Sequence, residues 1–586
     1  MKTCNRWLSL GVMVLLWLGL GGCSLLQDLG SRVPPVDSYA TARQVLTETL
    51  IPKINPISDP VSDPVAARYA VDRLPDPLPN LEDFPLYGAQ PSRDANVVYL
   101  EILTSSEKAN ADKQNERWLI DVADAFNAQN VSLPSGERIQ VGIRKIPSGS
   151  AARLLGAQAV EAAGYSPSND LWVEMVRSQG VGVIPVIEQL VPNVAGFVVQ
   201  DRVYQELAAD GEVTFERFLD RVLGGSYRVG YPNPYTSSTA LNLLYTILWQ
   251  AAGHQQDGRP LTATELSSPQ IHSVFDAFQK QVLITTVTTL DLQEIFIRDP
   301  DQLQAFPLEY QNYQTLKQLS GFENVAFIPF GIPHHNPLVG FDWNTPSQQQ
   351  ALQLFGDFAT SPAMQQLATA QGFAETDYFQ APGLPPIPSG EVLTAAQTYW
   401  KQRKDGGQTV YLMLVIDVSG SMNDSNRLTS VKEGLRIASG QINAGNQVGL
   451  VTFSDVVRSV LPLAPFETLH HQRLLAAIDR LVADGGTAMY DGMMVGLAEL
   501  MNRQQQDPNG RYYLLVLSDG ETNRGYGFAD IRDVLAYSGI RVYPIAYGEV
   551  NQAEMQAIAG LRESTVQAGT PSNVQTLLKD LFQTNL

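Results

Sequence analysis

The stretch LVIDVSGSM, residues 414–422, decides the fold of the C-terminal part of this chain. A run of apolar residues ends abruptly there in Asp417, Ser419 and Ser421, three short oxygen-bearing side chains at alternate positions. Such a run is typical of a strand that is buried on both faces of a parallel sheet. Ligands of open α/β sheets bind outside the carboxyl ends of the strands, so these three oxygens are candidates for a binding site.

Three more apolar runs and several helical patterns follow the same plan. The runs are QVGLVTF, RYYLLVL and RVYPIAY, at residues 447–453, 511–517 and 541–547. Between them lie segments in which apolar residues recur every three or four positions, within residues 428–442, 470–483, 489–504 and 529–539. The alternation of strands and helices predicts a doubly wound, mostly parallel α/β sheet over residues 405–586.

Two further oxygens occupy similar places. Thr487 in DGGTAMYDG precedes a predicted helix, and Asp519 in LVLSDGE directly follows a predicted strand. Two carboxylates and three hydroxyls suit a hard cation such as Mg²⁺, which takes six oxygen ligands and readily keeps waters. The alternative is that Asp417 and the serines only cap a helix and brace a turn.

The motifs DVSGS, GGT and SDG, in this order, resemble those of the von Willebrand factor A (VWA) domain and its metal-ion-dependent adhesion site. The resemblance implies a Rossmann-like fold in which five residues hold or brace Mg²⁺, or Mn²⁺ or Ca²⁺: Asp417, Ser419, Ser421, Thr487 and Asp519. It also implies a protein partner that offers an acidic residue to the metal.

The middle of the chain, residues 95–380, places hydroxyls between strands and helices three times, in ILTSSEK, IPSGSAARLL and YPNPYTSSTALN. Hydroxyls and backbone N–H groups at the start of a helix favour anions or polar ligands. Tyr235, Tyr310 and Tyr313 are candidate walls of a ligand site. The candidate ligand-binding residues are Ser106, Ser148, Gly149, Ser150, Ser237 and Ser238.

This succession of motifs resembles the type 2 periplasmic solute-binding proteins of transport systems. The resemblance implies two α/β lobes, a hinge, and a cleft that closes on a small-molecule or anionic solute. Two alternatives stay open. The serines only cap helices, or the domain is a scaffold whose cleft binds nothing.

The N-terminus has the pattern of an export signal. Lys2 and Arg6 precede an apolar stretch of about fifteen residues, shorter than the roughly 20 that a retained transmembrane helix needs. The sequence LGGC at residues 20–23 resembles the lipobox of bacterial lipoproteins. It implies removal of residues 1–22, lipid on Cys23, and a membrane-anchored protein in the cell envelope that faces the periplasm or the exterior.

Composition sets the remaining boundaries. Residues 23–94 are rich in proline and predict an extended stalk, in which TARQVLTETL, residues 41–50, is a candidate short helix. A second proline-rich break predicts a linker at residues 381–404. The net charge of −20 argues against nucleic-acid binding. We expect an exported, lipid-anchored binding protein rather than an enzyme. The alternatives are the substrate-binding component of a membrane transport system and a metal-dependent enzyme or assembly factor.

Overall fold

The computed structural model describes residues 33–586 apart from 65–67, 70, 72, 73, 75, 382 and 549. The predicted signal peptide and Cys23 lie outside the described residues. The chain divides into two compact units. Unit 1 holds the described residues up to Tyr69 with Val410–Lys432 and Asn446–Thr570, and unit 2 holds the rest, including Glu433–Gly445 and Pro571–Leu586.

Unit 1 contains one sheet of seven strands in the order β1-β15-β14-β13-β16-β17-β18. All neighbouring strands are parallel except β14 and β15. The strands are β1 (Ile57–Ser58), β13 (Val410–Asp417), β14 (Gln447–Phe453), β15 (Val457–Pro465), β16 (Arg511–Ser518), β17 (Arg541–Tyr547) and β18 (Gln567–Gly569). The predicted doubly wound, mostly parallel sheet is therefore confirmed, and the four apolar runs are strands β13, β14, β16 and β17.

The predicted helices are present at nearly the predicted positions. Strand β15 was not predicted, because its burial is uneven along its length and its sequence is therefore not a continuous apolar run. The helices that follow the strands are α17 (Arg427–Ser439), α18 (Thr468–Arg480), α19 (Met489–Gln506), α20 (Phe528–Ser538) and α21 (Gln552–Gly560), and a short 3₁₀ segment, η7 (Gly420–Asn426), precedes α17.

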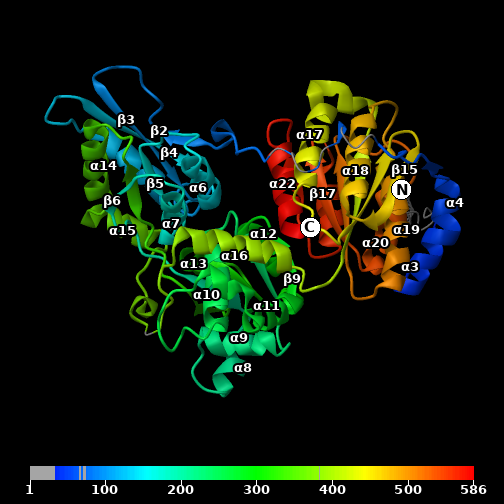
Figure 1. Cartoon of the computed structure of the whole chain (residues 1–586), viewed down its shortest axis with the longest axis horizontal. Coiled ribbons are helices and arrows are strands. Elements are labelled where there is room, and N and C mark those ends of the chain that lie inside the picture. Colours follow the sequence, from blue (N-terminus) through cyan, green and yellow to red (C-terminus); the bar gives the residue numbers. More distant parts are fainter. Residues whose placement is uncertain are drawn as a thin grey trace, which may run out of the picture. The chain divides into compact units, whose positions relative to one another are not determined.

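The structure differs from the expected extended stalk at residues 33–58. Three short helical elements, α3 (Tyr39–Val45), η1 (Leu46–Leu50) and α4 (Ile51–Ile54), pack beside α19 and α20 (Figure 1). Val45, Leu46 and Leu50 are buried in the core of unit 1, and β1 extends the sheet by pairing in parallel with β15. The short helix expected at residues 41–50 is present within α3 and η1, but its packing into the core of unit 1 was not expected.

Unit 2 contains two mixed sheets, which define two lobes. Lobe A has the strand order β2-β4-β3-β5-β12-β6, and lobe B has the order β11-β7-β10-β8-β9. The lobe A strands are β2 (Leu86–Gly88), β3 (Val97–Thr104), β4 (Arg138–Lys145), β5 (Gly164–Ser166), β6 (Val183–Ile187) and β12 (Leu338–Phe341). The lobe B strands are β7 (Ala195–Val199), β8 (Val229–Pro232), β9 (Val282–Thr286), β10 (Ala305–Glu309) and β11 (Ala326–Pro329).

Two chain segments connect the lobes, residues 188–194 and 330–337, and they are joined by a backbone bridge between Asn193 and His334. The predicted two-lobed architecture with a hinge region follows from this topology. The helices are α5 (Trp118–Ala128), α6 (Ser148–Gly156), α7 (Asp170–Ser178), α8 (Asp201–Ala209), α9 (Phe215–Leu223), α10 (Ser238–Ala251), α11 (Pro269–Gln281), α12 (Thr289–Arg298), α13 (Tyr310–Leu316), α14 (Pro346–Ala359), α15 (Pro362–Ala370), α16 (Gly390–Arg403) and α22 (Val574–Asn585).

The expected linker at residues 381–404 contains helix α16. Leu393, Ala396 and Trp400 of this helix are buried in the core of unit 2, and the Trp400 indole donates a hydrogen bond of 2.6 Å to the Tyr231 hydroxyl. The folded part of unit 2 therefore continues to the end of α16. In the part of the chain that the structure describes, no helix has both the length and the apolar character needed to cross a membrane.

Candidate metal centre and solute cleft

The predicted metal-site residues come from loops that leave neighbouring strands at the same edge of the unit 1 sheet. Asp417 is the last residue of β13, and Asp519 directly follows the last residue of β16. Strands β13 and β16 are parallel neighbours, so their carboxyl ends meet. Ser419 and Ser421 lie in the loop and the short 3₁₀ segment between β13 and α17.

Hydrogen bonds link four of the five predicted residues in a chain. The Ser419 N–H donates to Asp417 Oδ1 at 2.7 Å, and the hydroxyls of Ser419 and Ser421 lie 3.1 Å apart. The Ser421 hydroxyl then donates to Asp519 Oδ1 at 2.7 Å. Both carboxylates are buried. The fold thus brings two buried carboxylates and two hydroxyls together, as the sequence predicts.

Thr487 reaches the same edge through its backbone. The Gly420 N–H donates to Gly485 O at 2.9 Å, which joins the serine loop to the loop that carries Thr487. The Thr487 N–H donates to Asn523 Oδ1 at 3.0 Å, and its carbonyl accepts the Asn523 N–H. Among the described residues, no hydrogen bond joins its hydroxyl to the other four predicted side chains.

Two residues that sequence reasoning missed contact the carboxylates. The Ser518 hydroxyl donates to Asp417 Oδ2 at 2.6 Å, and the Arg427 guanidinium donates to Asp519 Oδ2 at 2.9 Å. Ser518 could have been found, because it precedes Asp519 in the SDG motif. Arg427 gave no signal, because it begins a helix and its pairing depends on the folded sheet.

The environment of Asp417 affects its charge. The pKa of Asp417 is raised to about 6. Burial is the main cause, and the Asp519 carboxylate also raises the pKa, whereas the hydrogen bonds from Ser419 and Ser518 lower it. A nearby cation would stabilise the charged form of this buried carboxylate. All the side-chain donors here are oxygens, which fits Mg²⁺, Mn²⁺ or Ca²⁺. The described residues include no group of three or more His, Cys, Asp or Glu that could hold a metal, so a centre here depends on the hydroxyls.

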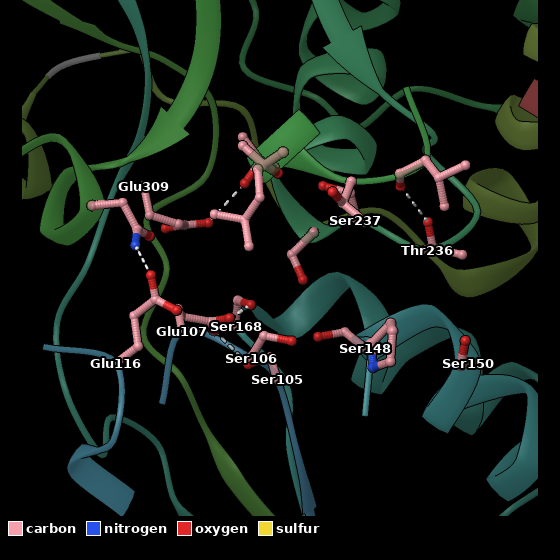
Figure 2. Close-up of a pocket in the computed structure, with 18 of the residues that line it drawn as sticks. Ser105, Ser106, Glu107, Glu116, Ser148, Ser150, Ser168, Thr236, Ser237 and Glu309 are labelled. Carbon is pink, nitrogen blue, oxygen red and sulfur yellow. Dashed lines mark hydrogen bonds between the residues drawn. The ribbon is translucent and has the colours of Figure 1, made fainter. Parts of the chain in front are cut away.

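A cavity of about 240 Å³ lies between the lobes of unit 2. Figure 2 shows Ser106, Ser148 and Ser150 of lobe A opposite Thr236 and Ser237 of lobe B. Five of the six predicted ligand residues line this cavity, namely Ser106, Ser148, Ser150, Ser237 and Ser238. The spacing of hydroxyls in three separate motifs therefore identified a single cavity.

The other predicted cleft residues lie elsewhere. Gly149 does not line the cavity, and its N–H donates instead to the Thr236 carbonyl at 3.3 Å. A Cβ at this position would lie 2.0 Å from the Tyr235 carbonyl oxygen, so glycine allows the two backbones to approach. The Tyr310 and Tyr313 rings pack on each other and on Phe327 in a lobe B core rather than on the cavity.

Tyr235 also fails to line this cavity. Its ring lies 6.0 Å from the ring of Trp400 in α16. The prediction of tyrosine walls is therefore wrong for Tyr310 and Tyr313, whose rings pack in the lobe B core, whereas Tyr235 lines a neighbouring cavity that also contains Ser150 and Thr236.

Sequence reasoning missed four acidic residues that line the cavity: the glutamates Glu107, Glu116 and Glu309, and Asp580 of α22. Glu107 follows directly after the serines of ILTSSEK, so its position was readable from the motif. Glu309 is the last residue of β10, where a single acidic residue in an apolar strand was the available signal. Glu116 lies in a loop of lobe A and gave none.

Two family models match this chain. The model described as a bacterial extracellular solute-binding protein matches residues 112–374, and the model described as a von Willebrand factor type A domain matches residues 412–583. These ranges coincide with the two-lobed body and with most of the β13–β18 region. They confirm both resemblances stated from the sequence.

Curated relatives match a limited part of the chain. The mouse collagen alpha-5(VI) chain is 26% identical over 153 residues, which cover 25% of this chain and 6% of the collagen. An uncharacterized Synechocystis protein, sll0103, is 25% identical over 176 residues, covering 29% of this chain and 40% of that protein. The bovine calcium-activated chloride channel regulator 1 is 26% identical over 151 residues, covering 25% and 16%. The matched stretch is thus less than half of each relative.

Solved structures match each part separately. Iron-bound HitA from Pseudomonas aeruginosa is 15% identical and covers 53% of this chain and 99% of its own, with a TM-score of 0.37. The sulfate-binding protein SubI from Mycobacterium tuberculosis is 16% identical and covers 52% and 98%, with a TM-score of 0.35. A von Willebrand factor type A protein from Catenulispora acidiphila is 20% identical and covers 30% and 42%, with a TM-score of 0.27.

Proposed function

Because this chain joins a bacterial extracellular solute-binding domain to a C-terminal VWA domain, we propose that it is a lipid-anchored binding protein of the cell envelope. Its VWA domain binds a protein partner through a metal ion, and its two-lobed domain binds a solute. The extracellular character of the solute-binding family supports the location. The lipobox-like sequence before Cys23 supports the anchor.

One observation carries the metal-dependent function. The side chains of Asp417, Ser421 and Asp519 are connected at the carboxyl edge of the sheet by the hydrogen bonds described above. A metal here would be held or braced by Asp417, Ser419, Ser421, Thr487 and Asp519. When bound, Mg²⁺ supplies a Lewis-acidic position that accepts a carboxylate oxygen from an acidic residue of the partner.

The chain's own residues would prepare this position. The Ser518 hydroxyl and the Ser419 N–H fix the two oxygens of Asp417, so the carboxylate cannot rotate freely. Arg427 holds Asp519 Oδ2, which leaves Asp519 Oδ1 turned to Ser421. This arrangement suits binding, and the proposal assigns no catalytic step to it.

The experiment measures metal binding before partner binding. Calorimetry with MgCl₂ is done on the chain from Ser24 onward and on Asp417→Asn, with Asp533→Asn as the matched control, because Asp533 is an exposed carboxylate on α20. We expect one Mg²⁺ site in the wild type and the control, and none in Asp417→Asn.

Envelope proteins are then captured on the three proteins with Mg²⁺ or with chelator. A partner retained by the wild type and Asp533→Asn with Mg²⁺, and lost in chelator and in Asp417→Asn, is the expected result. A partner whose retention is the same in all these conditions contradicts the metal-dependent function.

The second candidate function is that of the substrate-binding component of a transport system. The cavity between the lobes favours it, because five separately predicted hydroxyl positions converge there. The prediction is a ligand-dependent closure of the lobes, which small-angle scattering detects as a decrease in the radius of gyration when a solute is added. A ligand that binds without any such change argues for a static scaffold instead.

A further inference from the structure

The cavity between the lobes has an unusual charge pattern. Lobe A contributes Glu107 and Glu116, and lobe B contributes Glu309 (Figure 2). Among the described residues that line the cavity, none is a lysine, an arginine or a histidine. A site for an oxyanion needs donors of positive charge or free N–H groups at the ligand, and the side chains that line this site offer carboxylates and hydroxyls.

The side chains of Lys108 and His334, which contact two of these carboxylates, do not line the cavity. The Lys108 side chain is fully buried, and its ammonium donates to Glu107 Oε1 at 3.3 Å and to Ser105 Oγ at 2.8 Å. His334 is also fully buried and lies 2.9 Å from Glu309 Oε1. Neither Lys108 nor His334 lines the cavity, so a ligand would meet the carboxylates first.

Glu107 is held so that part of its carboxylate remains available. Lys108, Ser105 and Ser168 all donate to the same oxygen, Oε1. Within the described residues, Oε2 has no side-chain donor. Burial alone would raise the pKa of Glu107, but the Lys108 ammonium and the hydrogen bonds from Ser105 and Ser168 lower it below its usual value. Glu107 therefore carries a negative charge at neutral pH.

Ser148 supplies a second, independent sign of a ligand. It lines the cavity, its side chain is only 2% exposed, and its hydroxyl is a buried polar group without a hydrogen-bond partner in the described structure. A buried hydroxyl without a partner costs stability, so such groups are rare and indicate a missing water or ligand. The Ser148 oxygen can accept a hydrogen bond from a donor placed in the cavity.

One backbone N–H near the start of each of two cavity-lining helices already donates to a group of the protein. The Gly149 N–H near the start of α6 donates to the Thr236 carbonyl. At the start of α10, the Ser237 hydroxyl accepts the Ala240 N–H. The expectation of an anionic solute relied on such N–H groups, and the structure uses these two for contacts within the protein.

We propose that the cleft binds a small organic cation with N–H donors, such as a diamine, in preference to an oxyanion. The ammonium group would interact with Glu107 and Glu309, and its N–H groups would donate to the Ser148 hydroxyl. A bare metal ion fits less well, because the three carboxylates do not form a group that could hold one in the described structure. This inference rests on the proposed solute-binding function.

The test compares two sets of probes on the chain from Ser24 onward, by calorimetry in a buffer without divalent ions. The cationic probes are putrescine, spermidine and arginine, and the other probes are sulfate, phosphate and glucose. We expect binding of at least one cationic probe and no binding of sulfate or phosphate. Binding of sulfate, phosphate or glucose without any cationic probe overturns the inference but keeps the solute-binding function. Binding of no probe at 10 mM overturns both.

Two serine variants then locate the binding. Ser148→Ala removes a hydroxyl that has no protein partner, so its thermal stability should not fall, and it should bind the cationic probe about tenfold more weakly, as expected for one lost hydrogen bond. Ser166→Ala is the matched control, because Ser166 is equally buried, its hydroxyl is also without a partner in the described structure, and it does not line the cavity. Equal affinity of both variants and the wild type contradicts the assignment.

A charge variant completes the test. Glu107→Gln keeps the shape of the side chain and removes its charge, so we expect at least tenfold weaker binding of the cationic probe and unchanged behaviour towards sulfate. Because Lys108 depends on Glu107, circular dichroism must first show that this variant folds, and Glu309→Gln replaces it if it does not. Unchanged affinity in a folded charge variant overturns the proposal.

Discussion

Replacing Asp417 by asparagine should change the dependence of unit 1 stability on pH and on Mg²⁺ in a calculable way. Asparagine keeps an oxygen for the Ser419 N–H but carries no charge. In the absence of metal, burial raises the pKa of Asp417 from 3.8 to about 6. This difference corresponds to about 3 kcal/mol, because one pKa unit is about 1.4 kcal/mol.

The sign of the effect follows from proton linkage. A carboxyl whose pKa is higher in the folded state binds more protons folded than unfolded between pH 4 and pH 6. The metal-free wild type should therefore lose about 3 kcal/mol relative to Asp417→Asn as the pH rises from about 4 to 6, and the difference should stay constant above pH 6. Mg²⁺ should restore this stability in the wild type alone, and more at pH 7 than at pH 5.

The assay is urea unfolding of the wild type, Asp417→Asn and Asp533→Asn at pH values from 4 to 7.5, with chelator or with MgCl₂. Hydrogen exchange of peptides from β13 assigns the transition to unit 1. A difference between the wild type and Asp417→Asn that does not vary between pH 4 and 6 refutes the effect of burial. A Mg²⁺ response that survives in Asp417→Asn refutes the metal-site assignment.

Three other predictions follow from particular contacts. Arg427→Gln removes the guanidinium that neutralises Asp519, so the Mg²⁺ affinity measured by calorimetry should rise several-fold. Arg532→Gln is the surface control. A lower affinity of Arg427→Gln would mean that Arg427 organises the site. Leu50→Ala should lower the free energy of unfolding of unit 1 by about 2–5 kcal/mol, because Leu50 is buried. Ile57→Ala is the control and should leave this free energy unchanged, because Ile57 is exposed. Equal stability of both variants would restore the stalk interpretation. Cys23→Ser should move the protein from the membrane fraction to the soluble fraction, and retention in the membrane would exclude the lipid anchor.

The sequence predicted the core of unit 1 because its signals are local. Strand β13 is eight residues long and buried throughout, so its apolar run is unbroken. The elements that the sequence missed depend on tertiary contacts. The two-residue strand β1 exists through its pairing with β15, whereas the helix at residues 41–50 was predicted and only its burial against unit 1 was missed. No pattern in a proline-rich stretch distinguishes such a short strand from an extended chain.

The same reasoning explains the success and failure at the sites. Asp417, Ser419 and Asp519 were predictable because each is fixed by its place at a strand end. Glu309 was not predictable as a cavity residue, because the cavity forms only when the opposite lobe brings Glu107 close to it. Tyr310 and Tyr313 were predicted wrongly because an aromatic ring that follows a strand packs in a core as readily as it contacts a ligand.

The packing of the N-terminal helices in unit 1 limits the distance that can separate this unit from a membrane anchor at Cys23. Val33 is already a buried residue of its core. If Cys23 carries lipid, Val33 lies ten positions further along the chain, and a fully extended chain of this length spans at most about 35 Å. The segment that would connect the membrane anchor to the folded body is therefore short. A partner whose acidic residue meets the metal must present it close to the bilayer, and confinement to this thin layer raises the effective concentration of any partner anchored in the same membrane.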